Sequence, residues 1–77
     1  MRRIELIVAR IRKNKSQKVA AKEIGISAAY LVKLEAGISN PGRDTMICIS
    51  NYYQMPAEVL FPDLFCAFYD TQSIKYI

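Results

Sequence analysis

Residues 20–37, AAKEIGISAAYLVKLEAG, restrict the possible folds of this chain more than any other stretch. Gly25 divides the stretch into two helical patterns, and Gly37 closes the second one. Glycine adopts the positive φ that a chain takes just past a helix end, so both positions are typical helix stops. The pattern predicts two short helices, over 17–24 and 28–36, joined by a tight turn.

The small residues near this turn indicate that the two helices cross in close contact. Ala21 lies before the turn and Leu31 after it, and a larger side chain at Ala21 would push the second helix away. A β-branched residue at Gly25 would strain the turn. Ser16 and Ser27 each stand where an N-terminal cap is required. The spacing matches a helix-turn-helix unit, whose apolar floor is expected to contain Ile24, Ile26 and Leu34.

Helical patterns also flank this unit, so an all-α fold of five short helices with a C-terminal tail is predicted. A first helix over 3–14 follows from the helical spacing of Ile4, Ile7, Val8 and Ile11. A loop is expected at 38–42, and a fourth helix after it, starting at Arg43 or Asp44. The residues spaced for one face of that helix are Met46, Ile47, Ile49, Ser50 and Tyr53.

The end of the chain has weaker signals. Pro56 is expected at the first position of a short fifth helix, where proline is tolerated. SIKYI, residues 73–77, is the single candidate strand.

Positive charge is concentrated in one half of the chain. Residues 10–43 contain eight Lys or Arg against two Glu, whereas residues 44–77 contain one Lys against four acidic residues. A basic region of this kind favours a polyanionic partner, although the charge alone is equally consistent with a solvated surface.

Catalytic and metal-binding functions find no support in the composition. The chain has no histidine, no paired carboxylates in a pocket-forming context and no phosphate-binding glycine loop. Of its two cysteines, Cys48 is expected to be a small buried hydrophobe, and Cys66 is interpreted as structural or incidental. We therefore predict no enzymatic activity, no cofactor and no metal site.

The hydropathy pattern predicts a cytoplasmic protein with no membrane partner. No stretch approaches the about 18 consecutive apolar residues of a membrane span. The N-terminal MRRIELIVAR lacks the length and the cleavage site of a signal peptide.

SQKVAAKEIGIS, residues 16–27, followed by YLVKLEAG and SNPGRDT, resembles the Cro/CI-type (XRE-like) helix-turn-helix family of phage and bacterial transcriptional regulators. The resemblance covers about residues 6–61. Lys15, at a position that is usually apolar, and Ala20, at one that is usually Leu, depart from the family and suggest a thinner core under the first two helices. The residues typical of the family are Gln17, Ala21, Gly25, Ser27, Leu31, Glu35, Gly37, Asn40 and Pro41.

This resemblance implies a compact lambda-repressor-like DNA-binding domain over residues 1–61 and an aromatic tail over 62–77. The implied partner is a double-stranded DNA operator, with the third predicted helix in the major groove. Alanine offers a base only apolar contact, for example with the thymine methyl, so Tyr30 or Lys33 would supply the hydrogen bonds. The implied residues near the bases are Ser27, Ala28, Ala29, Tyr30 and Lys33.

Phosphate contacts are implied for a second group of residues, and such contacts make binding weaken steeply with salt. This group comprises Gln17, Lys18, Asn40 and Arg43. In the family, an Arg near the end of the first helix commonly pairs with a Glu after the recognition residues. Arg10 and Glu35 stand at these positions, which implies a structural ion pair and not a DNA contact.

Regulators of this kind usually bind as two-fold dimers, so a homodimer is expected. We expect the dimer surface in the tail, although folding of the tail over the core is the open alternative. The apolar residues of the tail are Leu64, Phe65, Phe68, Tyr69, Ile74, Tyr76 and Ile77.

The expected function is sequence-specific transcriptional regulation by a dimeric repressor that occludes a promoter. Phage Cro-like proteins and controllers of restriction–modification systems act in this way. An antitoxin-type autoregulator and a protein-interaction module on the same fold are the alternatives. RNA polymerase or a regulatory protein is a further candidate partner.

Overall fold

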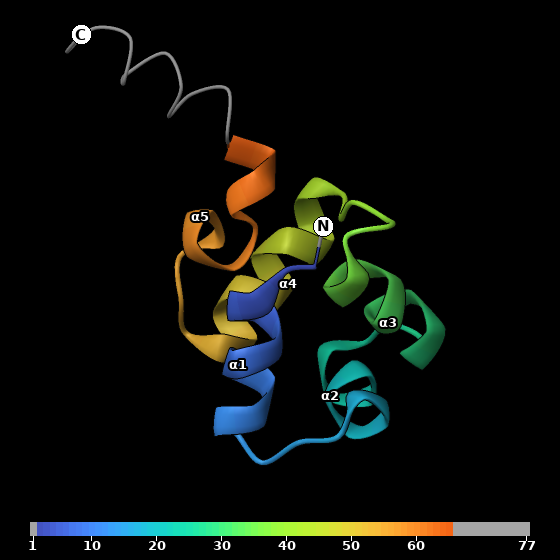
Figure 1. The fold of residues 1–77 in the computed structure, drawn as a ribbon. Coiled ribbons are helices and arrows are strands. Elements are labelled where there is room, and N and C mark those ends of the chain that lie inside the picture. Colours follow the sequence, from blue (N-terminus) through green and yellow to red (C-terminus); the bar gives the residue numbers. More distant parts are fainter. Residues whose placement is uncertain (1, 66–77) are drawn as a thin grey trace, which may run out of the picture.

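The computed structural model describes residues 2–65, and each of its regular elements in this range is helical (Figure 1). The α-helices are α1 (Ile4–Arg12), α2 (Gln17–Ile24), α3 (Ala28–Ala36), α4 (Arg43–Tyr53) and α5 (Ala57–Leu60). A 3-10 helix, η1 (Pro62–Phe65), follows them. The predicted all-α architecture is confirmed, whereas the candidate strand at 73–77 and Cys66 lie outside the described residues.

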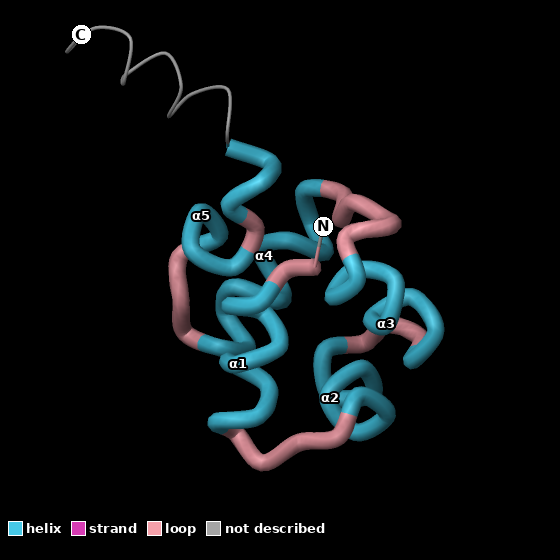
Figure 2. The backbone as a smooth tube through the Cα atoms, in the orientation of Figure 1, coloured by secondary structure: helices cyan, strands magenta, loops and turns pink. Residues whose placement is uncertain are grey.

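The α2–α3 pair packs beside a group formed by α1, α4 and α5, and short loops join the helices (Figure 2). One apolar cluster holds the two parts together. Leu34 of α3 is fully buried in this cluster, and Ile24 and Ile26 pack against it, as the sequence predicted for the floor of the helix pair. The other buried members are Leu6, Ala9, Ile49, Tyr53, Leu60 and Phe61.

A second, smaller cluster forms the contact between α2 and α3. Ala20, Ala21 and Leu31 are buried together in it. Tyr52 of α4 and Ala28 pack against this cluster. Two consecutive alanines on α2 therefore allow the close helix crossing that the sequence indicated.

The predicted caps and stops are confirmed. The hydroxyl oxygens of Ser16 and Ser27 accept hydrogen bonds from the backbone N–H groups of Val19 (3.1 Å) and Tyr30 (3.0 Å). Gly25 has φ +99° and Gly37 has φ +77°. Because each cap satisfies an otherwise unpaired N–H group, the helices of the turn have well-defined ends.

The buried face of α1 differs from the prediction. Ile4 and Ile11, which were expected to face the core, are each 57% exposed, while Ala9 is buried. The helix is rotated so that its buried face contains Leu6, because Arg3, just before the helix, and Arg10 both bond to α3. Arg3 bonds to the Leu34 carbonyl, and Arg10 bonds to Glu35.

The face of α4 was also predicted only in part. Ile49 and Tyr53 are buried and Met46 is half-buried, but Ile47 is exposed. The prediction that Cys48 is a buried hydrophobe was wrong, because its free thiol lies on the exposed side of α4. One residue along a helix turns the side chain by about 100°, so the neighbour of buried Ile49 points away from the core.

The helix ends needed smaller corrections. Helix α1 ends at Arg12, and Asn14 has already turned to φ +58°. Helix α4 begins at Arg43, with Gly42 as its N-cap. Pro56 is the N-cap of α5 and not its first helical residue, because its ψ of 144° is extended. The missing N–H of proline is unused at either position.

Gly25 provides a test of the turn conformation. Gly25→Ala should lower the free energy of unfolding by about 1–2 kcal/mol, because a Cβ strains the left-handed conformation. Crowding by the rest of the fold does not contribute, since no atom beyond Gly25 and its two chain neighbours lies within 4 Å of the added Cβ. Urea denaturation measures the change.

Gly42→Ala is the matched control for this substitution. Gly42 also has open space around a Cβ, but its φ is −71°, so the change should stay within about 0.5 kcal/mol. Equal effects of the two substitutions would contradict the conformational explanation.

Candidate nucleic-acid interface

The exposed side of α3 is the centre of the candidate interface. Ala29, Val32 and Lys33 are exposed, whereas Ala28 and Tyr30 are half-buried. Ser27 is exposed immediately before the helix, with its hydroxyl oxygen engaged in the cap. The first turn of α3 therefore presents small side chains, which let a helix approach a groove closely.

The loop after α3 is attached to this helix. The Tyr30 hydroxyl donates a hydrogen bond to the backbone carbonyl of Asn40 (3.3 Å). The Asn40 side-chain oxygen accepts a hydrogen bond from Arg3 Nη2 (2.7 Å). The amide nitrogen of Asn40 therefore remains available as the donor of this side chain.

Several cations of this region are available for an anionic partner. Lys18, Lys33 and Arg43 are exposed, and none of them forms an ion pair with another residue of the described range 2–65. Lys15 instead pairs with Glu23 (3.3 Å), and the Lys13 ammonium lies 4.8 Å from the centre of the Tyr52 ring.

Glu35 is the acidic residue of α3, and its charge is compensated inside the protein. It is only 3% exposed, and its carboxylate oxygens lie 2.8 Å from Arg10 Nε and 3.3 Å from Arg10 Nη2. Arg10 Nη1 also donates to the backbone carbonyl of Lys15 (3.0 Å). The carboxylate is thus neutralised beneath α3, and it does not oppose an approaching polyanion.

Gln17 has a contact that sequence reasoning did not anticipate. Its side-chain nitrogen donates to Glu35 Oε1 (2.9 Å). An amide nitrogen carries two hydrogens, so one orients the side chain on Glu35 and the second can serve another acceptor. The residue stands at the first position of α2, where free backbone N–H groups favour an anion.

Two tyrosines of α4 lie near acidic residues of this region. Tyr52 donates a hydrogen bond to Glu23 of α2. Burial and this bond raise the pKa of Tyr52 to about 12, and the same bond lowers the pKa of Glu23. The Tyr53 hydroxyl is buried with no partner among the described residues. Burial, followed by the nearby Glu35 carboxylate, raises the pKa of Tyr53.

A family model described as Helix-turn-helix matches residues 6–60 of the chain. The chain belongs to this family. The match supports the XRE or Cro/CI type, as the sequence motifs indicated, and such proteins are DNA-binding transcriptional regulators. No curated protein and no solved structure gave a match.

The helix-turn-helix protein contains one buried arginine whose role the sequence did not reveal. Arg3 is 2% exposed, and all five of its guanidinium N–H groups can be assigned to acceptors. Nε and Nη2 bond to the Asp63 carboxylate (both 2.9 Å), and Nη2 also bonds to the Asn40 side chain. Nη1 bonds to the backbone carbonyls of Leu34 (2.6 Å) and Ser39 (2.8 Å).

The Arg3 network also affects charge and stacking. The guanidinium lies 5.3 Å from the centre of the Phe61 ring, and its hydrogen bond lowers the pKa of Asp63. In the sequence, no feature distinguishes Arg3 from the adjacent Arg2 as the arginine that becomes buried. Arg3 lies three residues before Leu6 and six before Ala9, a spacing compatible with either burial or exposure, so no local signal singled it out.

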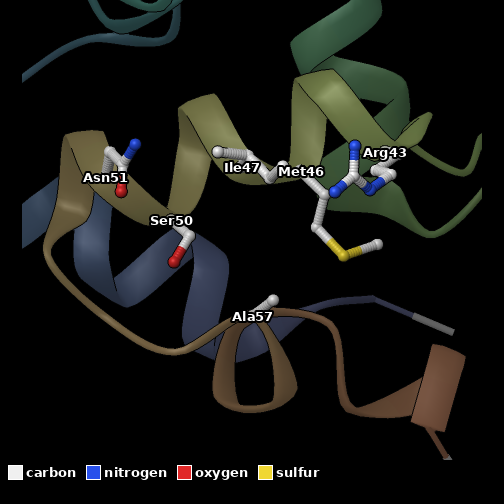
Figure 3. Close-up of a pocket in the computed structure, with 6 residues that line it drawn as sticks. All are labelled: Arg43, Met46, Ile47, Ser50, Asn51 and Ala57. Carbon is white, nitrogen blue, oxygen red and sulfur yellow. The ribbon is translucent and has the colours of Figure 1, made fainter.

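A shallow pocket of about 200 Å³ lies on α4 and α5 of the helix-turn-helix protein (Figure 3). Met46, Ile47 and Ala57 supply its apolar part. Ser50, Asn51 and Arg43 supply its polar part, and Arg43 is also one of the candidate phosphate contacts.

Neither a metal-binding cluster nor a membrane-spanning helix is present in the described part of the chain. Residues 2–65 contain no group of three or more Cys, Asp or Glu side chains arranged to hold a metal ion. None of the helices described here has the length and hydropathy needed to cross a membrane.

Replacement of Arg3 tests its network. Arg3→Lys keeps the charge but cannot reach the five acceptors, so the free energy of unfolding should fall by about 2 kcal/mol. Chemical denaturation followed by circular dichroism measures this change. Arg2→Lys, at an exposed neighbouring arginine, should leave stability within about 0.5 kcal/mol. Two variants of equal stability would contradict the structural role of Arg3.

Proposed function

We propose that this helix-turn-helix protein is a sequence-specific, dimeric repressor that binds an operator and occludes a promoter in the cytoplasm. Its family supports DNA-binding regulation. The observation that carries the proposal further is the charge arrangement around α3. Glu35 is neutralised by Arg10, while Lys18, Lys33 and Arg43 stay exposed.

The proposed contacts divide into base and phosphate groups. Ala29 and Lys33 are exposed on α3, and a helix of this width fits the major groove of B-DNA. The residues proposed at the bases are Ser27, Ala28, Ala29, Tyr30 and Lys33. The residues proposed at the phosphates are Gln17, Lys18, Asn40 and Arg43. The proposal involves no catalytic step and no cofactor.

Two further points support a homodimer. One α3 reads only a few base pairs, so two copies on adjacent half-sites are needed for a useful operator. Apolar side chains are also exposed on α4 and α5, at Ile47 and Val59. We propose that these helices and the tail after Phe65 form the dimer surface.

The pocket on α4 and α5 also favours a second candidate function. A small apolar pocket with a polar edge suits a side chain of another protein, including RNA polymerase or a regulatory protein. In that case the protein would act as an interaction module, or as an antitoxin-type autoregulator that binds both DNA and a partner.

DNA binding is tested by selection from a random duplex pool, followed by a salt titration on the enriched sequence. A pseudo-palindromic motif should be enriched, and the logarithm of the binding constant should fall by about 0.9 per neutralised phosphate for each unit of log salt concentration. Ala29→Glu should abolish this binding while the helical circular dichroism signal is kept, because it places a carboxylate at the groove.

Ile4→Glu is the matched control. Ile4 is also exposed in the first turn of a helix, and the substitution changes the net charge by the same amount. It should reduce affinity only slightly. Retained operator binding by the Ala29 variant would refute the placement of α3 in the groove.

Dimerisation is tested by truncation after Phe65, which keeps the bond between Arg3 and Asp63. The truncated protein should be monomeric in sedimentation analysis and should bind the operator at least about tenfold more weakly, because the two half-sites are no longer linked. A truncated protein that remains dimeric would move the interface away from the tail.

A further inference from the structure

The recognition surface of α3 is poor in the side chains that usually read bases. Its sequence, AAYLVKLEA, contains no Asn, Gln or Arg, and Glu35 is buried in its ion pair. Bidentate recognition of adenine by Asn or Gln, and of guanine by Arg, is therefore absent from this helix. Lys33 is the exposed side chain of α3 that can make a charged hydrogen bond.

The remaining polar groups near α3 are partly committed within the protein. The Ser27 hydroxyl oxygen caps the helix, and the Tyr30 hydroxyl donates to the carbonyl of Asn40. The Gln17 side-chain nitrogen is oriented by Glu35. Each keeps some bonding capacity, but none is placed as an uncommitted reader of a base edge.

Apolar surface is what α3 presents instead. Ala29 is exposed, and Val32, three residues further on the same side of the helix, is 43% exposed. Exposed cations on neighbouring elements, Lys18 and Arg43, match the charge of a DNA backbone. In the major groove, the apolar group that distinguishes one base pair from another is the thymine C5-methyl.

We infer that α3 selects its operator mainly through thymine methyl groups, which Ala29 and Val32 contact in the major groove. This inference rests on the proposed function and names the chemical class of its target. The half-site should accordingly contain thymines at the positions that face these two side chains. Lys33 then adds one polar contact to a mainly apolar recognition.

The test replaces each thymine of the selected operator by deoxyuridine, which lacks only the C5-methyl group. Affinity is measured by fluorescence anisotropy at constant salt. Each contacted methyl should contribute roughly a fourfold change in affinity. At the same positions, a 5-methylcytosine·guanine pair should bind more tightly than an unmethylated cytosine·guanine pair, because it returns the methyl group.

Two matched variants connect the effect to α3. Val32 and Val19 are both 43% exposed helical valines, but Val19 lies in the first turn of α2. Val32→Ala should reduce the difference between thymine and deoxyuridine at one or two positions, whereas Val19→Ala should leave this difference unchanged.

The outcomes separate the two proposals. Specific, salt-dependent operator binding that deoxyuridine does not weaken at any position would overturn the inference and leave the proposed function standing. An identical response of the Val32 and Val19 variants would also overturn it. Absence of any enriched duplex sequence would instead refute the proposed function, and the inference with it.

Discussion

The structure depends on the burial of one guanidinium group. Arg3 is almost inaccessible to solvent, and a buried guanidinium with unused N–H groups would be strongly unfavourable. Its five donors are therefore bonded to the end of α3, to the following loop and to Asp63 of η1. These contacts determine how the C-terminal end of α3 and the Asn40 loop are held.

Helix α3 is restrained at several points along its length. Ser27 caps its first turn, Leu31 packs on the alanines of α2, and Glu35 is bonded to Arg10 and Gln17. The bonds of Glu35 keep its negative charge away from the surface and orient the Gln17 side chain at the start of α2. Packing and electrostatics thus leave one face suited to an anionic partner, and the small exposed side chains of α3 are suited to apolar contact in a groove.

Prediction succeeded where the signal was local. The two glycines and the two serines define the turn and its caps because capping and positive φ involve residues within one helical turn. Prediction failed for the rotation of α1 and for Cys48, since the periodicity of a mostly apolar helix allows more than one buried face. In α1, the bonds of Arg3 and Arg10 decided between these faces.

The sequence by itself determined the five helices, the tight turn at Gly25 and the concentration of positive charge in residues 10–43, because each follows from neighbouring residues or from composition. Only the tertiary structure decided which charges remain available to DNA and which are used within the fold. The family resemblance implied the bond between Arg10 and Glu35, 25 positions apart, but nothing in the sequence indicated the bond between Arg3 and Asp63, 60 positions apart. Such pairs form only when folding brings distant segments together and removes water from around them, and no local pattern encodes that outcome.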